Sequence, residues 1–136
     1  MRVNGWEREL RLVVEKHLAL LSAYGVSDCY IIADDAVEAV TGKRMYSGAR
    51  GYRTSAGAAR KLRRRGFLTV EDAFAAKFER IPVALAQRGD IGVIYQPGGE
   101  VTGGVFIGTG FFTRAEGGAV VLPHSAVTHA FKVGRD

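Results

Sequence analysis

Apolar side chains recur at helical spacing through the first part of the chain. Intervals of three or four residues separate them, which predicts one helix with a single buried stripe. We expect this helix to end near Gly25, because glycine readily adopts the left-handed conformation found at helix ends. We interpret His17, which lies on the stripe, as a core residue. The stripe consists of Trp6, Leu10, Val13, His17 and Leu21.

A second helix is predicted within the segment Ser27–Gly42. Asp28 suits its N-cap position, because a carboxylate there accepts hydrogen bonds from the unpaired N–H groups of the first turn. Gly42 provides the end of this helix. The residues expected to face the core are Ile31, Ala33, Val37 and Val40.

Two shorter helices are predicted after a glycine-containing loop. The first spans roughly residues 55–65. The second follows Thr69, which approximates a capping box with Asp72, and should end near Arg80.

After Asp90 the pattern changes to short apolar runs separated by glycine-rich turns. The runs have strand length and contain β-branched and aromatic residues, so we predict four or five antiparallel strands. Helices followed by strands predict an α+β fold, with N-terminal helices packed on a C-terminal antiparallel sheet. We expect residues 1–136 to form a single domain. Its mainly helical half would span 1–82 and its strand half 83–136.

The composition is that of an ordinary globular protein, with 47% apolar and 24% charged residues. The chain has one cysteine, so its fold is not expected to depend on an internal disulfide. No apolar run approaches the roughly 20 residues that a membrane span needs. Charged residues also interrupt the start of the chain, which argues against a signal peptide and favours cytoplasmic synthesis.

Positive charge is concentrated in one part of the sequence. Residues 43–65, here called the basic segment, hold nine of the 19 lysines and arginines and no acidic residue. The segment is interpreted in three ways: as a solvated helix end, as a nucleic-acid surface, or as a docking surface for a protein partner. Arginine and tyrosine are favoured in protein interfaces, and no nucleic-acid-binding motif is present, so we rank protein docking above nucleic acid. The candidate contact residues are Arg50, Tyr52, Arg53, Arg60, Arg63 and Arg64.

Cys29 is the candidate nucleophile. It follows the predicted N-cap Asp28, and the first turn of a helix stabilises a thiolate. A nucleophilic cysteine also needs a base, and the three histidines of the chain are His17, His124 and His129. The structural alternative is that Cys29 is a small, half-buried residue.

No group of His, Cys, Asp and Glu residues has the spacing of metal ligands, so we predict no metal and no cofactor. Asp90, which follows Arg88 and Gly89, is interpreted as a turn residue before a strand. The glycines of residues 103–110 precede no helix, so hairpins explain them better than a phosphate-binding loop.

Three segments together resemble the NlpC-type branch of the papain-like cysteine peptidases: GVSDCYIIADDAVEAVTG, RGDIGVIYQ and GGVFIGTGFFTRAEGG. That family has an Asp-Cys pair opening a helix, then a Gly-Asp pair before the first core strand, then a glycine-terminated strand. The match covers roughly residues 25–122. More narrowly, the chain is similar over nearly its whole length to a small group of phage-borne proteins encoded among tail genes. The matching stretches are Asp28–Gly42, Ala49–Arg64 and Ile81–Asp90.

The resemblance implies that Cys29 occupies the nucleophile position. It also implies that Thr102 replaces the general-base histidine and that Arg114 replaces the third, orienting residue. Threonine is no base near neutral pH, and arginine accepts neither a proton nor a hydrogen bond. We therefore expect a degenerate peptidase domain that is not an enzyme. The resemblance implies a structural or assembly component at a phage tail tip, located in the virion and contacting other tail proteins.

Two other functions stay open at this point. An active cysteine peptidase or amidase acting on cell-wall peptidoglycan would need His124 or His129 as a substitute base. A nucleic-acid-binding module would use the basic segment and bind less tightly as salt is added.

Overall fold

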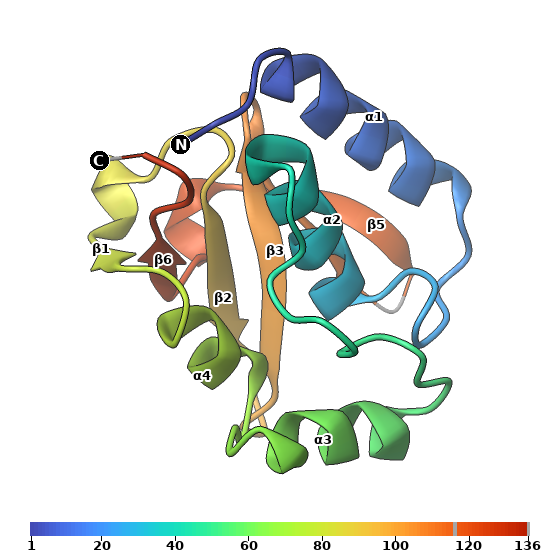
Figure 1. Ribbon diagram of the computed structural model, residues 1–136. Helices are drawn as coiled ribbons and strands as arrows, with labels where there is room; N and C mark the ends of the chain where they lie inside the picture. The colour runs from blue at the N-terminus through green and yellow to red at the C-terminus, as the bar shows by residue number, and fades with distance from the viewer. Residues whose placement is uncertain (116, 136) are drawn as a thin grey trace.

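The computed structural model describes residues 1–115 and 117–135 and has the expected α+β class (Figure 1). Four helices precede the longer strands, as the sequence predicts. The helices are α1 (Trp6–Ala19), α2 (Cys29–Thr41), α3 (Ser55–Arg64) and α4 (Val70–Ala75). The strands are β1 (Arg80–Ile81), β2 (Ile91–Tyr95), β3 (Val101–Ile107), β4 (Gly110–Ala115), β5 (Gly118–Leu122) and β6 (His129–Phe131). Two short 3-10 turns are η1 (Val83–Leu85) and η2 (His124–Ala126).

The strands form one six-stranded antiparallel sheet in the order β1-β6-β2-β3-β4-β5. The sequence predicted four or five strands and missed β1, because two residues ahead of a proline show no alternating pattern. β6 pairs with both β1 and β2, since Phe131 stands opposite Arg80 on one side and Ile91 on the other. The last strand of the chain therefore returns to the interior of the sheet.

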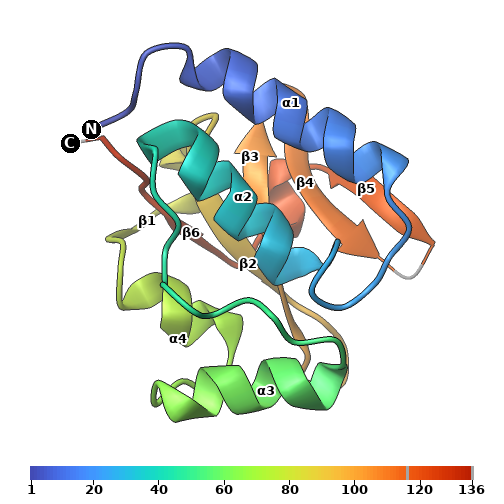
Figure 2. The ribbon, with the colours of Figure 1, turned by 45° about the vertical axis from the view of Figure 1, so that its right-hand side comes forward.

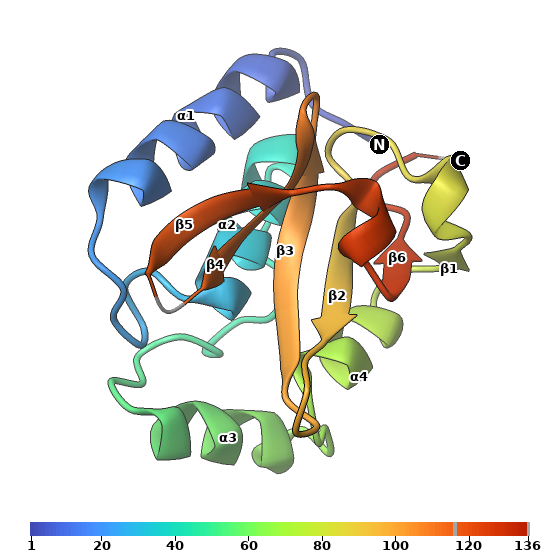
Figure 3. The same ribbon diagram turned by 180° about the vertical axis from the view of Figure 1, so that it is seen from behind.

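The helices lie on one side of the sheet, with α2 packed directly on β2, β3 and β4 (Figures 1 and 2). α1 contacts α2 and β5, whereas α4 contacts β2 and β3. α3 lies at one end of the molecule in every view, beyond the end of the β2–β3 hairpin and beside α4. Figure 3 shows the opposite face of the sheet, which η2 crosses.

Each face of the sheet carries its own apolar cluster. The larger cluster joins α2 and α4 to the sheet, and Ile32, Phe74 and Phe112 are fully buried in it. The smaller cluster lies on the opposite face, where the Phe106 and Phe111 rings meet edge to face with their centroids 5.0 Å apart. The sheet is therefore covered on both sides, and the helices on the larger cluster position the residues described below.

The start of α2 agrees with the sequence prediction, whereas the end of α1 does not. The Oδ1 of Asp28 accepts a hydrogen bond from the Ile31 N–H at 2.8 Å, and Gly42 ends α2 with a φ of 84°. α1 ends at Ala19 because Leu20 has extended backbone angles, several residues before Gly25.

The predicted fourth helix is also shorter than expected. The capping box between Thr69 and Asp72 is present at its start. It ends at Ala75, and Arg80 belongs to β1 instead of to the helix.

Candidate functional site

Cys29 is the first residue of α2 and lies between two cavities. The first, here called the α3 cavity, encloses about 300 Å³ between the start of α2, α3, the start of α4 and the β2–β3 turn. The second, here called the β4 cavity, encloses about 240 Å³ between the α1–α2 loop, β3 and the end of β4. The residues shared by both linings are Tyr24, Asp28, Cys29 and Glu100.

The electrostatic surroundings of Cys29 keep its thiol protonated. Burial is the largest influence and raises the pKa of the thiol, the Gly103 and Tyr30 backbone lowers it, and the Asp28 and Glu100 carboxylates raise it, with a resulting pKa of about 11. The sequence led us to expect a thiol that ionises easily at the helix start. Desolvation outweighs that effect, so the thiolate is scarce at neutral pH.

The strand opposite Cys29 presents no side chain to it. Gly103 is the β3 residue on the α2 side, and a Cβ added there would lie 3.4 Å from the Cys29 carbonyl oxygen and 3.0 Å from the Phe74 ring. Thr102 is the next residue along β3. It pairs with Ile94 of the smaller cluster and also lines the β4 cavity. The structure therefore brings Thr102 near Cys29 but supplies no base there.

His17 lies in α1 and is fully buried. Its Nδ1 is 2.7 Å from the Ser27 Oγ, and its Nε2 is 2.8 Å from the Asp35 Oδ2. The order of these groups is that of a Ser-His-Asp triad, but Ser27 is itself fully buried. Asp35 also accepts hydrogen bonds from Lys16 and Arg50. The cluster ties α1 to α2 and offers no accessible nucleophile.

The other two histidines are engaged away from Cys29. His124 is exposed in η2, and its ring meets the Phe106 ring on the opposite face of the sheet at a centroid distance of 4.8 Å. His129 packs against Tyr95 at 5.3 Å, and its Nε2 is 3.8 Å from the Glu71 Oε2. Neither histidine lines a cavity with Cys29.

Arg114 is buried at the wall of the β4 cavity, where it binds the end of α1. Its guanidinium donates to the carbonyl oxygen of His17 at 2.6 Å, to that of Leu20 at 3.0 and 3.1 Å, and to the Ser22 Oγ at 3.0 Å. These carbonyls lie at a helix end, where they lack partners within the helix. Arg114 therefore caps α1 and does not orient a base.

The candidate contact residues of the basic segment divide into two groups. Arg50 forms ion pairs with Asp34 at 2.9 Å and with Asp35 at 2.6 Å, and the Tyr52 hydroxyl donates to the Asp28 Oδ2 at 2.8 Å. These two side chains therefore hold the fold together. The remaining four are exposed, on α3 or just before it: Arg53, Arg60, Arg63 and Arg64.

No pattern in the sequence indicates the α3 cavity or the presence of Tyr30 in its lining. Tyr30 follows Cys29 in an apolar helix and resembles an ordinary core residue. In the structure its hydroxyl is buried and has no hydrogen-bond partner among residues 1–115 and 117–135, and the same holds for Arg114 Nε. Only the three-dimensional arrangement reveals such unpaired atoms.

In residues 1–115 and 117–135, no group of three or more His, Cys, Asp and Glu side chains is arranged to hold a metal ion. None of the helices in this described part is both long enough and apolar enough to cross a membrane.

Comparison with known proteins gives one match. The family model of a domain of unknown function, DUF6950, matches residues 1–133. No curated protein and no solved structure matches the chain.

Proposed function

The chain belongs to the DUF6950 family, a domain family of unknown function, and we propose that it is a non-catalytic docking component. In this proposal an NlpC-like cysteine peptidase framework has lost its catalytic pair and serves as a structural or assembly part of a phage tail tip. The phage tail assignment rests on the sequence resemblance. The loss of catalysis rests on the site.

The observation that carries the proposal is that the three histidine rings contact residues other than Cys29. A cysteine nucleophile needs a neighbouring base or a lowered pKa. Here the thiol pKa is raised to about 11, and the nearest position on β3 is Gly103. Arg114, at the third position of the resemblance, is committed to the carbonyls that end α1.

Thiol labelling tests the loss of catalysis. We expect iodoacetamide to alkylate Cys29 in the native protein at pH 7.5 roughly a hundredfold more slowly than in urea, because burial suppresses the thiolate. The wild-type protein should not digest purified peptidoglycan, and the Cys29→Ala variant should give the same result. Fast native labelling, together with a digestion that Cys29→Ala abolishes, would establish the peptidase instead.

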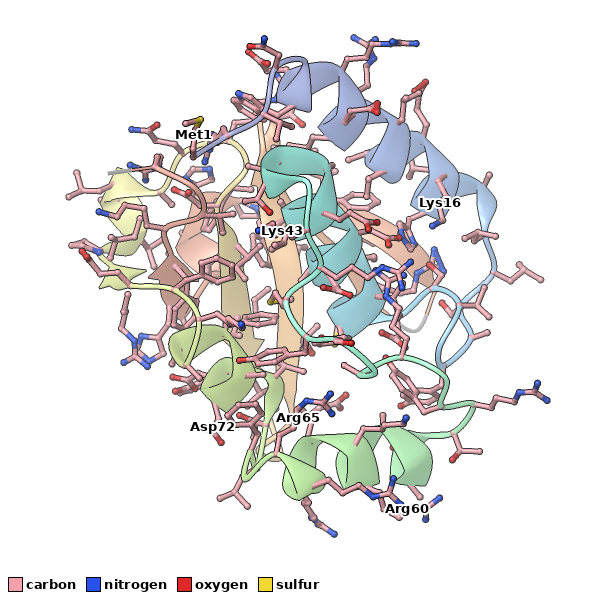
Figure 4. The ribbon with its side chains drawn as sticks, viewed as in Figure 1. Met1, Lys16, Lys43, Arg60, Arg65 and Asp72 are labelled. Atoms are coloured by element: carbon pink, nitrogen blue, oxygen red, sulfur yellow. The ribbon has the colours of Figure 1, made fainter. Side chains whose placement is uncertain are left out.

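The surface best suited to docking is the exposed face of α3. Arg60 and Arg63 are exposed there, and Figure 4 shows Arg60 extending from α3 away from the sheet. Arginine is enriched at the centres of protein interfaces, and an acidic partner would neutralise this face. The proposed partners are therefore tail proteins with an acidic contact surface.

Charge reversal tests this docking surface. The double variant Arg60→Glu/Arg63→Glu should reduce incorporation of the protein into phage tails at least tenfold. The matched control is Arg8→Glu/Arg11→Glu, which makes the same charge change on exposed positions of α1. Circular dichroism checks that both variants fold. Normal incorporation of the α3 variant would place the docking surface elsewhere.

A further inference from the structure

The strand β5 stands at the edge of the sheet, and its outer side has no strand beside it. All of its residues, Gly118–Leu122, pair with β4, and no other backbone hydrogen bond within residues 1–115 and 117–135 involves them. Every second residue of such a strand directs its N–H and C=O groups away from the sheet. These groups form a template on which a further strand can pair.

The two edges of the sheet differ in their protection. At the opposite edge, β1 has only two residues, one of them Arg80, and Pro82 follows it. Short strands, charged side chains and proline are the devices by which proteins block an edge. β5 has five residues, and the sequence from Gly117 to Pro123 contains no charge. The sheet is therefore suited to accept a further strand at β5 and not at β1.

The two faces of β5 are already covered by the fold. Ala119 packs against the larger apolar cluster, on the helix side of the sheet, and Leu122 packs against the smaller cluster. Val121 shares the face of Ala119, because side chains alternate along a strand, yet it remains 47% exposed. A partner would therefore cover the open edge and Val121.

Two exposed leucines lie beside the start of β5. Arg114 pairs with Ala119 and donates to the Leu20 carbonyl oxygen, so the end of α1 lies next to this strand. Leu18 and Leu21 precede and follow Leu20, and they are 59% and 88% exposed. Large apolar side chains grouped beside an open edge favour an interface with another protein chain.

We propose that β5 pairs antiparallel with β5 of a second copy of this chain. A two-fold axis needs a surface that complements itself, and an uncharged strand meets this condition because it brings no like charges together. The axis reverses the second strand, so the leucines beside the start of one β5 lie over the end of the other, where Val121 is exposed. Because the β1 edge is blocked, pairing stops at two copies and does not continue into a fibre.

The dimer is independent of the docking face on α3. β5 lies apart from α3 in all three ribbon views, so both surfaces can be occupied at the same time (Figures 1–3). Dimerisation is measured on the purified protein, so its result does not depend on incorporation into tails.

Analytical ultracentrifugation of the purified protein tests the proposal. The interface is small, so we expect a reversible dimer with a Kd of about 10 μM. Val121→Lys should weaken this dimer at least tenfold, because each copy brings a cation to the same face of the paired strands. Val121→Glu should weaken it in the same way. An equimolar mixture of the two charged variants should dimerise again, since unlike charges then meet.

Two control variants separate charge at the interface from other effects. Val121→Thr keeps a branched and uncharged side chain, so it should leave the Kd unchanged. Leu68→Lys adds the same charge at an exposed position between α3 and α4 and should also leave the Kd unchanged. A wild-type protein that stays monomeric at about 1 mM would overturn the proposal. A Val121→Lys variant that dimerises like the wild type, or a mixture of the two charged variants that stays monomeric, would overturn it as well.

Discussion

Asp35 shows how strongly one buried carboxylate can depend on its partners. It accepts hydrogen bonds from Lys16 at 2.9 Å, from His17 at 2.8 Å and from Arg50 at 2.6 Å. Burial alone raises the pKa of Asp35, but the hydrogen bonds from His17, Lys16 and Arg50 outweigh it and hold this pKa well below its ordinary range. The ionised form is therefore the one that the folded state stabilises.

This difference in pKa predicts a loss of stability in acid. An unfolded aspartate has a pKa of about 3.9. Because the folded pKa lies lower, the contribution of Asp35 is complete above about pH 5 and declines as the pH falls below 4. Urea unfolding at pH 7, 4 and 3 should show a steeper decline for the wild type than for Asp35→Asn. Parallel declines in the two proteins would contradict the assignment.

The residues that sequence reasoning identified are those whose roles are local. Asp28 caps the helix that follows it, and the nearby Gly42 ends it. The roles of Arg114 and His17 depend on partners that lie far away in the chain or on another helix, and no spacing rule encodes them. The sequence therefore identified Cys29 as a candidate but could not show the chemical surroundings that suppress its ionisation.

At the scale of the element, the end of α1 depends on a residue of β4. Arg114 meets the last carbonyls of the helix, whose partners would otherwise be missing, and it also binds Ser22 in the following loop. Removing it leaves buried carbonyls unpaired. This contact explains why the helix ends before the glycine that the sequence suggested.

Arg114→Met keeps the length of the side chain and removes its hydrogen bonds. We expect the free energy of unfolding in urea to fall by about 2–3 kcal/mol, and amide exchange to accelerate in the last turn of α1. Arg114→Lys should recover only part of the loss, because one ammonium group cannot reproduce the two-pronged contact. Arg8→Met, on the exposed face of the same helix, is the control and should change stability by at most about 0.5 kcal/mol.

At the scale of the whole molecule, the two ends of the described chain lie side by side in all three ribbon views (Figures 1–3). The α+β class followed from the change of pattern along the sequence. The strand order did not, because β6 pairs between β1 and β2 through contacts that span much of the chain. Non-local pairing of this kind leaves no local pattern to detect.

Asp90 joins these distant segments. It is fully buried before β2, and its carboxylate binds Arg2 near the start of the chain and Arg135 near its end. It also accepts hydrogen bonds from the backbone N–H of Gln87 and of Val133. Asp90 is therefore more than the turn residue that the sequence indicated, because its single negative charge also offsets the repulsion between two arginines.

Asp90→Asn keeps the shape of the side chain and removes the charge that the two arginines share. Breaking a buried ion pair from one side costs about 3–5 kcal/mol, and partial exposure of Arg2 and Arg135 places our expectation near 3 kcal/mol. Adding Arg2→Met and Arg135→Met to Asp90→Asn should recover part of this loss, because no unpaired cation then remains. The opposite result would be a triple variant less stable than Asp90→Asn by the full cost that Arg2→Met and Arg135→Met have in the wild type. That result would show that Asp90 does not act by offsetting repulsion between the arginines. In that case the hydrogen bonds to Gln87 and Val133 carry its contribution.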